Sequence, residues 1–81
     1  MIYGKELGLV MRAKPGHEFR MAELMKGVTE HLVQQGVTVD RRKQRAIRVG
    51  IADLLKVLEA NGTLRVKRAK KRGSYSLYRL K

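Results

Sequence analysis

One amphipathic segment, residues 41–61, constrains the fold of this chain more than any other feature of its sequence. Its large apolar residues fall on one face when each residue advances about 100° around a helix. These residues are Ile47, Ile51, Leu54, Leu55 and Leu58. Thr38 and Asp40 are alternative N-caps, Gly50 weakens the pattern mildly, and Asn61-Gly62 supplies a stop. We therefore expect one helix over residues 41–61, with its apolar stripe in a folded core.

The first forty residues predict two shorter helices. Apolar residues at a spacing of three to four predict helices over residues 5–12 and 21–36, with Gly27 as a candidate break in the second. Lys14-Pro15-Gly16 marks a turn between them. Residues 18–20 are a candidate for a very short strand that leads into the second helix.

After the long helix come two strand-like runs, residues 63–67 and 74–80, joined by residues 68–73. In the first run apolar and basic side chains alternate, so we expect Leu64 and Val66 to face inward. The second run holds two apolar pairs on opposite faces, and we expect one pair to complete the core while the other is partly exposed. The alternative pairs are Tyr75 with Leu77 and Tyr78 with Leu80.

Length and composition fit a single small domain over residues 1–81. Apolar residues make up 43% of the chain, which lies above the disordered range, so a packed core is expected. Cys is absent, which excludes disulfides and thiolate metal sites. No apolar run approaches the roughly 18 residues that span a bilayer, and the N-terminus lacks a signal-peptide pattern. We expect a cytoplasmic protein, associated with the nucleoid if the source is bacterial.

Two stretches of the sequence resemble the winged helix-turn-helix DNA-binding superfamily. Residues 54–64 (LLKVLEANGTL) look like its junction between recognition helix and wing, where an apolar helix end, an acidic residue and a Gly lead into the first wing strand. Residues 19–24 resemble its short strand entering the second helix. The resemblance implies an α+β, mostly helical fold with three helices and a C-terminal β-hairpin wing. The distance from Leu24 to Glu59 exceeds that of compact members, which implies an extended second or third helix.

The positive charge of the chain is confined to its second half. The formal net charge is +12, and residues 41–81 hold fourteen of the nineteen bases with only two acids, Asp53 and Glu59. Residues 1–40 carry as many acids as bases and read as a scaffold. A split of this kind indicates a polyanionic partner, with nucleic acid ahead of an anionic membrane.

The bases of the long helix gather at its N-terminal end, on the side opposite the apolar stripe. There each cation opposes the positive end of the helix dipole, at a cost of about 0.3–1 kcal/mol, whereas docked phosphates would turn this repulsion into attraction. Val49 and Ala52 are small, which leaves room for close approach to a major groove about 12 Å wide. The predicted nucleic-acid contacts on this helix are Arg41, Arg42, Lys43, Arg45, Arg48, Val49 and Lys56.

The loop between the two strand-like runs carries a second basic cluster. Five of the six residues 67–72 are basic, and Gly73 then permits a turn. We expect this wing to follow the phosphate backbone or to insert a base into the minor groove, which positions the protein without reading sequence. A loop that merely raises solubility is the alternative. The predicted contacts in the wing are Lys67, Arg68, Lys70, Lys71 and Arg72.

Groups suited to catalysis or metal binding are scarce in the sequence. His17 and His31 are the two histidines, and neither has a second His at metal-ligand spacing. Ser74 and Ser76 have no base nearby in sequence, and no Gly-rich phosphate loop is present. We therefore expect no enzymatic activity, no catalytic residues, no metal site and no cofactor.

Taken together, these patterns favour sequence-preferring binding of double-stranded DNA by a recognition helix and a basic wing, in a small transcriptional or replication regulator. The first alternative is an RNA-binding or ribosome-associated winged-helix protein, although four aromatic residues are few for a reader of single strands. The second is an adaptor that binds an acidic protein partner. No membrane partner is expected, because the basic helix has no exposed apolar face with aromatics. The sequence does not decide whether the protein dimerises. Many winged helices bind as pairs, but no clear apolar dimer stripe remains here once the core is assigned.

Overall fold

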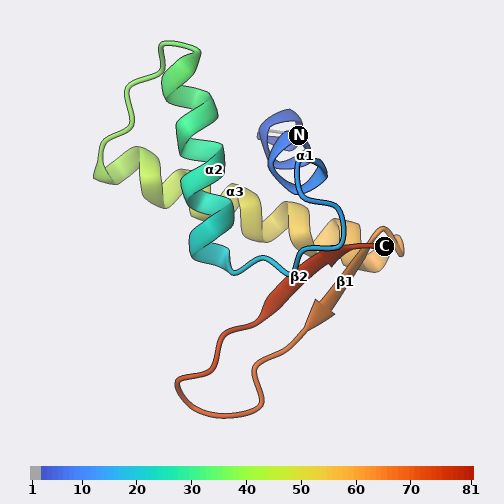
Figure 1. Cartoon of the computed structure of the whole chain (residues 1–81). Helices are drawn as coiled ribbons and strands as arrows, with labels where there is room; N and C mark the ends of the chain where they lie inside the picture. Colours follow the sequence, from blue (N-terminus) through green and yellow to red (C-terminus); the bar gives the residue numbers. More distant parts are fainter. Residues whose placement is uncertain (1–2) are drawn as a thin grey trace.

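The computed structural model describes residues 3–81 of the protein. Three helices come first along the chain: α1 (Gly4–Arg12), α2 (Met21–Gln34) and α3 (Arg41–Ala60). Two short strands, β1 (Leu64–Lys67) and β2 (Leu77–Leu80), follow as an antiparallel hairpin whose loop projects beyond the helices (Figure 1). The fold is α+β and mostly helical, with the helix order and the C-terminal hairpin of a winged-helix-like fold, as the sequence predicts.

The long helix α3 forms where its periodicity places it. Asp40 is its N-cap, because the Asp40 Oδ1 atom accepts a hydrogen bond from the Lys43 backbone N–H at 2.8 Å. Gly62, with φ +83°, continues the chain away from the helix end. At 20 residues this is the extended third helix implied by the sequence. It buries one stripe, made of Ile47, Ile51, Leu54 and Leu55.

Helix α2 is continuous, so the expectation of a break at Gly27 is wrong. A Cβ atom at Gly27 would lie 2.7 Å from Cγ2 of Val10, which means that this glycine lets α1 and α2 approach closely. The helix ends at Gln34, two residues before the expected stop at Gly36. Gly36 (φ +86°) then turns the chain, and the Val37 N–H donates to the Leu32 carbonyl at 3.0 Å.

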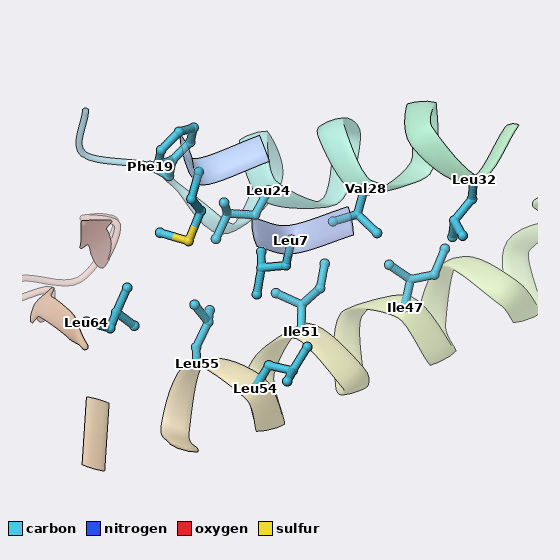
Figure 2. Close-up of a cluster of buried hydrophobic side chains, with 11 residues drawn as sticks. Leu7, Phe19, Leu24, Val28, Leu32, Ile47, Ile51, Leu54, Leu55 and Leu64 are labelled. Atoms are coloured by element: carbon cyan, nitrogen blue, oxygen red, sulfur yellow. The ribbon is translucent and has the colours of Figure 1, made fainter. Parts of the chain in front are cut away.

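The core lies between the three helices and the base of the hairpin. In Figure 2, Leu24, Val28 and Leu32 of α2 point toward the buried stripe of α3. Helix α1 adds Leu7 and Met11, and both are 2% exposed. The hairpin and the turn before α2 close the cluster with Leu64 and Phe19.

The hairpin is extended by one residue of the segment before α2. Phe19 and Tyr78 exchange two backbone hydrogen bonds of 2.8 Å each, which adds a minimal third strand beside β2. This pairing settles which apolar pair of the second run faces inward: Tyr78 and Leu80 pack against the core, whereas Tyr75 is 67% exposed. Leu64 is buried and Val66 is half-buried against the core, as the alternation predicts.

Strand β2 is shorter than expected, since it begins at Leu77 instead of residue 74. The last pair in the register is Lys67 with Leu77. Beyond it the Ala69 N–H donates to the Ser76 hydroxyl at 3.3 Å, so a side chain takes the place of a ladder carbonyl. Strand pairing therefore stops where the run of bases begins.

Candidate nucleic-acid interface

Most of the bases predicted for α3 share its outer face. With about 100° per residue, four of these positions fall on the side of the helix away from the buried stripe, and Arg48 flanks the stripe two turns before Leu55. All five are exposed. We call this set the basic face, and it consists of Arg41, Arg42, Arg45, Arg48 and Lys56. No acidic residue lies in the first turn of α3, so its cations meet the positive helix end with only the Asp40 cap beside them. Such a surface is matched to a polyanion.

Small side chains occupy the middle of the basic face. Val49 is 62% exposed, and Ala52 is half-buried. Neither side chain is long enough to hold the helix away from a ligand surface. The centre of α3 can therefore approach a groove closely while the longer Arg and Lys side chains reach around it.

Lys43 is set apart from the basic face. Its Nζ atom lies 5.8 Å from the centroid of the Tyr3 ring, and the side chain is half-buried on the side of α3 that faces this ring. Gly50, two turns further on, lies against the same ring, since a Cβ there would be 2.8 Å from Cδ2 of Tyr3. The structure thus does not bring Lys43 together with Arg45 and Arg48, and it explains why Gly50 is tolerated inside a long helix.

The wing, defined as the β1–β2 hairpin with its loop of residues 68–76, presents the second group of bases. All five predicted contacts are exposed: Lys67, Arg68, Lys70, Lys71 and Arg72. The loop turns at Gly73, whose φ is +87°, and the Ser74 N–H donates to the Lys71 carbonyl at 3.1 Å. We call residues 70–73 the wing tip, and its three bases project into solvent.

One base of the wing is paired with the end of α3. The Arg68 Nη2 atom donates to Glu59 Oε1 at 2.7 Å, with side-chain exposures of 72% and 36%. This pair joins the root of the wing to the last turn of the helix. Because the pair is exposed, its contribution to stability is small. Arg68 is partly neutralised, which leaves the wing tip as the more available charge.

A second contact ties the wing to the start of α2. The Arg20 guanidinium lies 4.9 Å from the centroid of the Tyr75 ring, a cation–π geometry. The sequence prediction missed this contact, because it treated the first forty residues as scaffold on the ground of their zero net charge. The contact depends on the pairing of Phe19 with Tyr78, which brings Arg20 to the wing and which no local pattern in the sequence indicates.

A hollow of about 460 Å³ lies between α2, α3 and the wing. Its lining comes from three elements that are far apart in the chain: Met21, Ala22 and Met25 of α2, Arg48 of α3, and Ala69, Ser74, Tyr75, Ser76 and Tyr78 of the wing. The start of α2, Arg48 of α3 and the wing therefore border one concave surface.

The turn before α2 is held by a carboxylate. Glu23 accepts hydrogen bonds from the His17 ring at 3.0 Å and from the Arg20 backbone N–H at 3.2 Å. The His17 contact first, and then the Arg20 N–H, hold the pKa of Glu23 below its ordinary value of 4.5. This arrangement fixes the backbone of Arg20, the residue that contacts the wing.

In comparisons with protein-family models, with curated proteins and with solved structures, no family, protein or structure matches this chain. A proposal for its function therefore rests on the geometry of the chain itself. Across residues 3–81, no helix has both the length and the apolar character needed to cross a membrane.

Proposed function

We propose that this protein is a member of the winged helix-turn-helix superfamily that binds double-stranded DNA with sequence preference, as a small transcriptional or replication regulator in the cytoplasm. The observation that carries the proposal is that α3 and the wing adjoin. Arg48 lines one hollow with the wing, and Lys56 lines a second hollow with Arg68. A helix flanked by a basic hairpin fits a duplex, because the major groove admits the helix while the adjoining backbone meets the hairpin.

The basic face is suited to the readout of bases. The 20 residues of α3 extend about 30 Å at 1.5 Å per residue, and its leading residues would enter the groove first. Arg42 and Arg45 are exposed there, and a planar guanidinium can donate two hydrogen bonds to O6 and N7 of guanine. Phosphates at the N-terminal end of α3 would offset the repulsion between its cations and the helix dipole.

The wing is suited to backbone contacts. Lys70, Lys71 and Arg72 are exposed on a turn outside the strands, where they can follow phosphates without a fixed geometry. We expect them to add affinity and salt dependence to every duplex alike. In this proposal α3 supplies the sequence preference and the wing supplies position.

RNA binding is a second candidate, which Tyr75 favours. Its ring is 67% exposed and borders the hollow, as a stacking platform for an unpaired base would. However, Phe19 is buried and Tyr78 packs on the core, so Tyr75 would have to act without a second platform beside it. Duplex DNA is therefore the better fit.

The test is selection of bound sequences from a random duplex pool by the full chain, followed by competition at one fixed salt concentration. Duplex DNA, structured RNA and an acidic protein compete for the bound probe. We expect enrichment of a defined sequence, and displacement by that duplex at the lowest concentration. A palindromic site would indicate a homodimer, because half-site symmetry mirrors protein symmetry. Equal competition by the acidic protein, or preferential competition by RNA, would contradict the proposal.

A further inference from the structure

We propose that Val49 contacts the 5-methyl group of a thymine in the major groove. This inference rests on the proposed function and deepens it, because it names one base that the basic face selects. Val49 would then contribute to sequence specificity, and not only allow the close approach of α3 to the groove.

Val49 stands out among the apolar residues of α3. It is 62% exposed, whereas Leu58 and the stripe that includes Ile51 pack in or against the core, and Val57 is 42% exposed. A β-branched residue lowers helix propensity slightly, and an exposed one gains little from burial in return. The side chain of Val49 therefore contributes little to the stability of the fold.

The neighbours of Val49 favour the edges of bases over phosphates. Arg45 lies one turn before it and Asp53 one turn after it, and both side chains are exposed. The carboxylate of Asp53 would repel a phosphate placed there. The half-buried Ala52 adds no bulk that would keep Val49 away from a groove floor. In the major groove the apolar group that base pairs present is the thymine methyl, which an exposed valine can cover.

Helix geometry limits where that thymine lies. Val49 follows Arg45 by four residues, which is about 6 Å along the helix axis. Base pairs stack about 3.4 Å apart, so the thymine falls within about two base pairs of the base that Arg45 contacts. Since arginine prefers guanine, we expect a guanine and a thymine within that span of the selected site.

The experiment replaces each thymine of the selected duplex by uracil, one position at a time. This change removes the methyl group and leaves every hydrogen-bonding group of the base in place. For the unaltered protein we expect one position at which affinity falls about fourfold, equivalent to about 0.8 kcal/mol for one buried methyl-sized group at 1.4 kcal/mol per tenfold. For Val49→Ala we expect the same uracil duplex and its thymine parent to bind equally.

Val57→Ala is the matched control, because it removes an exposed valine from the same helix. It should keep the fourfold sensitivity to uracil. Both variants place a better helix former in α3, so loss of folding is not expected to obscure the result.

The outcomes separate this inference from the proposed function. A selected duplex that is insensitive to uracil at every position overturns the role of Val49 and leaves DNA binding in place. The role of Val49 is equally overturned if Val49→Ala remains as sensitive to uracil as the unaltered protein. If the chain binds no duplex in preference to an acidic protein, the proposed function fails and this inference fails with it.

Discussion

The two basic surfaces of the protein differ in how they are held. The basic face belongs to a helix that is fixed by four buried side chains on its opposite side: Ile47, Ile51, Leu54 and Leu55. The strands of the wing pack on the core, but the wing tip has no buried residue. The loop of the wing contacts the helices through two exposed pairs, Arg68 with Glu59 and Tyr75 with Arg20. One surface holds its charges at fixed spacing on a helix, and the other is a charged turn at the end of a hairpin (Figure 1).

Because of this difference, Arg and Lys side chains on α3 and on the wing tip are suited to different kinds of contact with DNA. Two-pronged recognition of guanine by arginine needs a guanidinium held at a defined position and angle, which a core-anchored helix provides. A phosphate presents oxygens in several directions and accepts a lysine from many. In the proposed function, bases on α3 would therefore discriminate between sequences, whereas bases on the wing tip would add affinity that is independent of sequence.

The largest expected effect tests the anchoring itself. Replacing the fully buried Ile51 by Ala should lower the free energy of unfolding by about 2–5 kcal/mol, because it leaves a cavity under the basic face. Replacing Lys70, Lys71 and Arg72 together by Ala should change it by less than about 0.5 kcal/mol. Denaturant unfolding followed by circular dichroism measures both values. Equal destabilisation by the two variants would show that the wing tip is part of the folded core.

The next effect tests whether the anchored surface reads sequence. Arg45→Ala should weaken binding to a selected duplex by about 1–3 kcal/mol and relax the preference at one position. Lys43→Ala is the matched control, since it removes one charge from the same helix but on the side that faces Tyr3. Titrations of selected and random duplexes measure the difference. An equal loss on both duplexes, or an equal loss for Lys43→Ala, would contradict the assignment of the basic face.

A smaller effect is expected for each base of the wing tip. Replacing Lys70, Lys71 or Arg72 singly by Ala should weaken selected and random duplexes alike. It should also reduce the slope of log K against log salt by about 0.9 for each lost phosphate contact. Titrations at several salt concentrations measure that slope. Lys26→Ala on α2, an exposed base outside the concave surface, should leave the slope unchanged.

The anchored helix could be predicted from the sequence because its signal is local. Each buried residue of α3 recurs at the spacing of one face, and that spacing also places Arg42 and Arg45 outward. Which pair of the last strand faces inward could not be predicted, because the answer lies in the pairing of Tyr78 with Phe19, a residue remote in sequence. Periodicity within a segment carries no information on which distant segment it meets.

The glycines and Lys43 show a second limit of prediction from sequence. Gly27 and Gly50 lower helix propensity by about 1 kcal/mol relative to Ala, which predicts weak points in the helices. Their benefit is the close approach of Val10 and of the Tyr3 ring, which only the packed structure reveals. Charge counting also grouped Lys43 with the basic face, although Lys43 precedes Ile47 by four residues and therefore lies on the stripe side of the helix, near the Tyr3 ring. The zero net charge of the first forty residues likewise gave no indication that Arg20 contacts the wing, because that contact depends on where Arg20 lies in the fold.

The smallest expected effect concerns the support of the wing root at the start of α2. Glu23 accepts hydrogen bonds from the His17 ring and from the Arg20 N–H, and these contacts lower its pKa in the folded protein relative to 4.5. An acid with a lowered folded pKa stabilises the fold above its unfolded pKa, and this contribution is lost as pH falls through the folded value. Glu23→Gln should therefore lower stability near pH 6, by less than about 1 kcal/mol because the carboxylate is largely solvated. The deficit should shrink below pH 4.5.

Denaturant unfolding of the unaltered protein and of Glu23→Gln, at pH values from about 6 to about 3, measures the loss of stability. Glu30→Gln, which removes one carboxylate at an exposed position of the same helix, is the control for the loss of a charge from α2. A deficit for Glu23→Gln that stayed constant to about pH 3 would mean that Glu23 acts through packing instead of charge. Because Arg20 contacts the wing, Glu23→Gln should also leave the preference for the selected duplex unchanged. A change in that preference would mean that the support of the wing root reaches the basic face, and the two surfaces would then act as one.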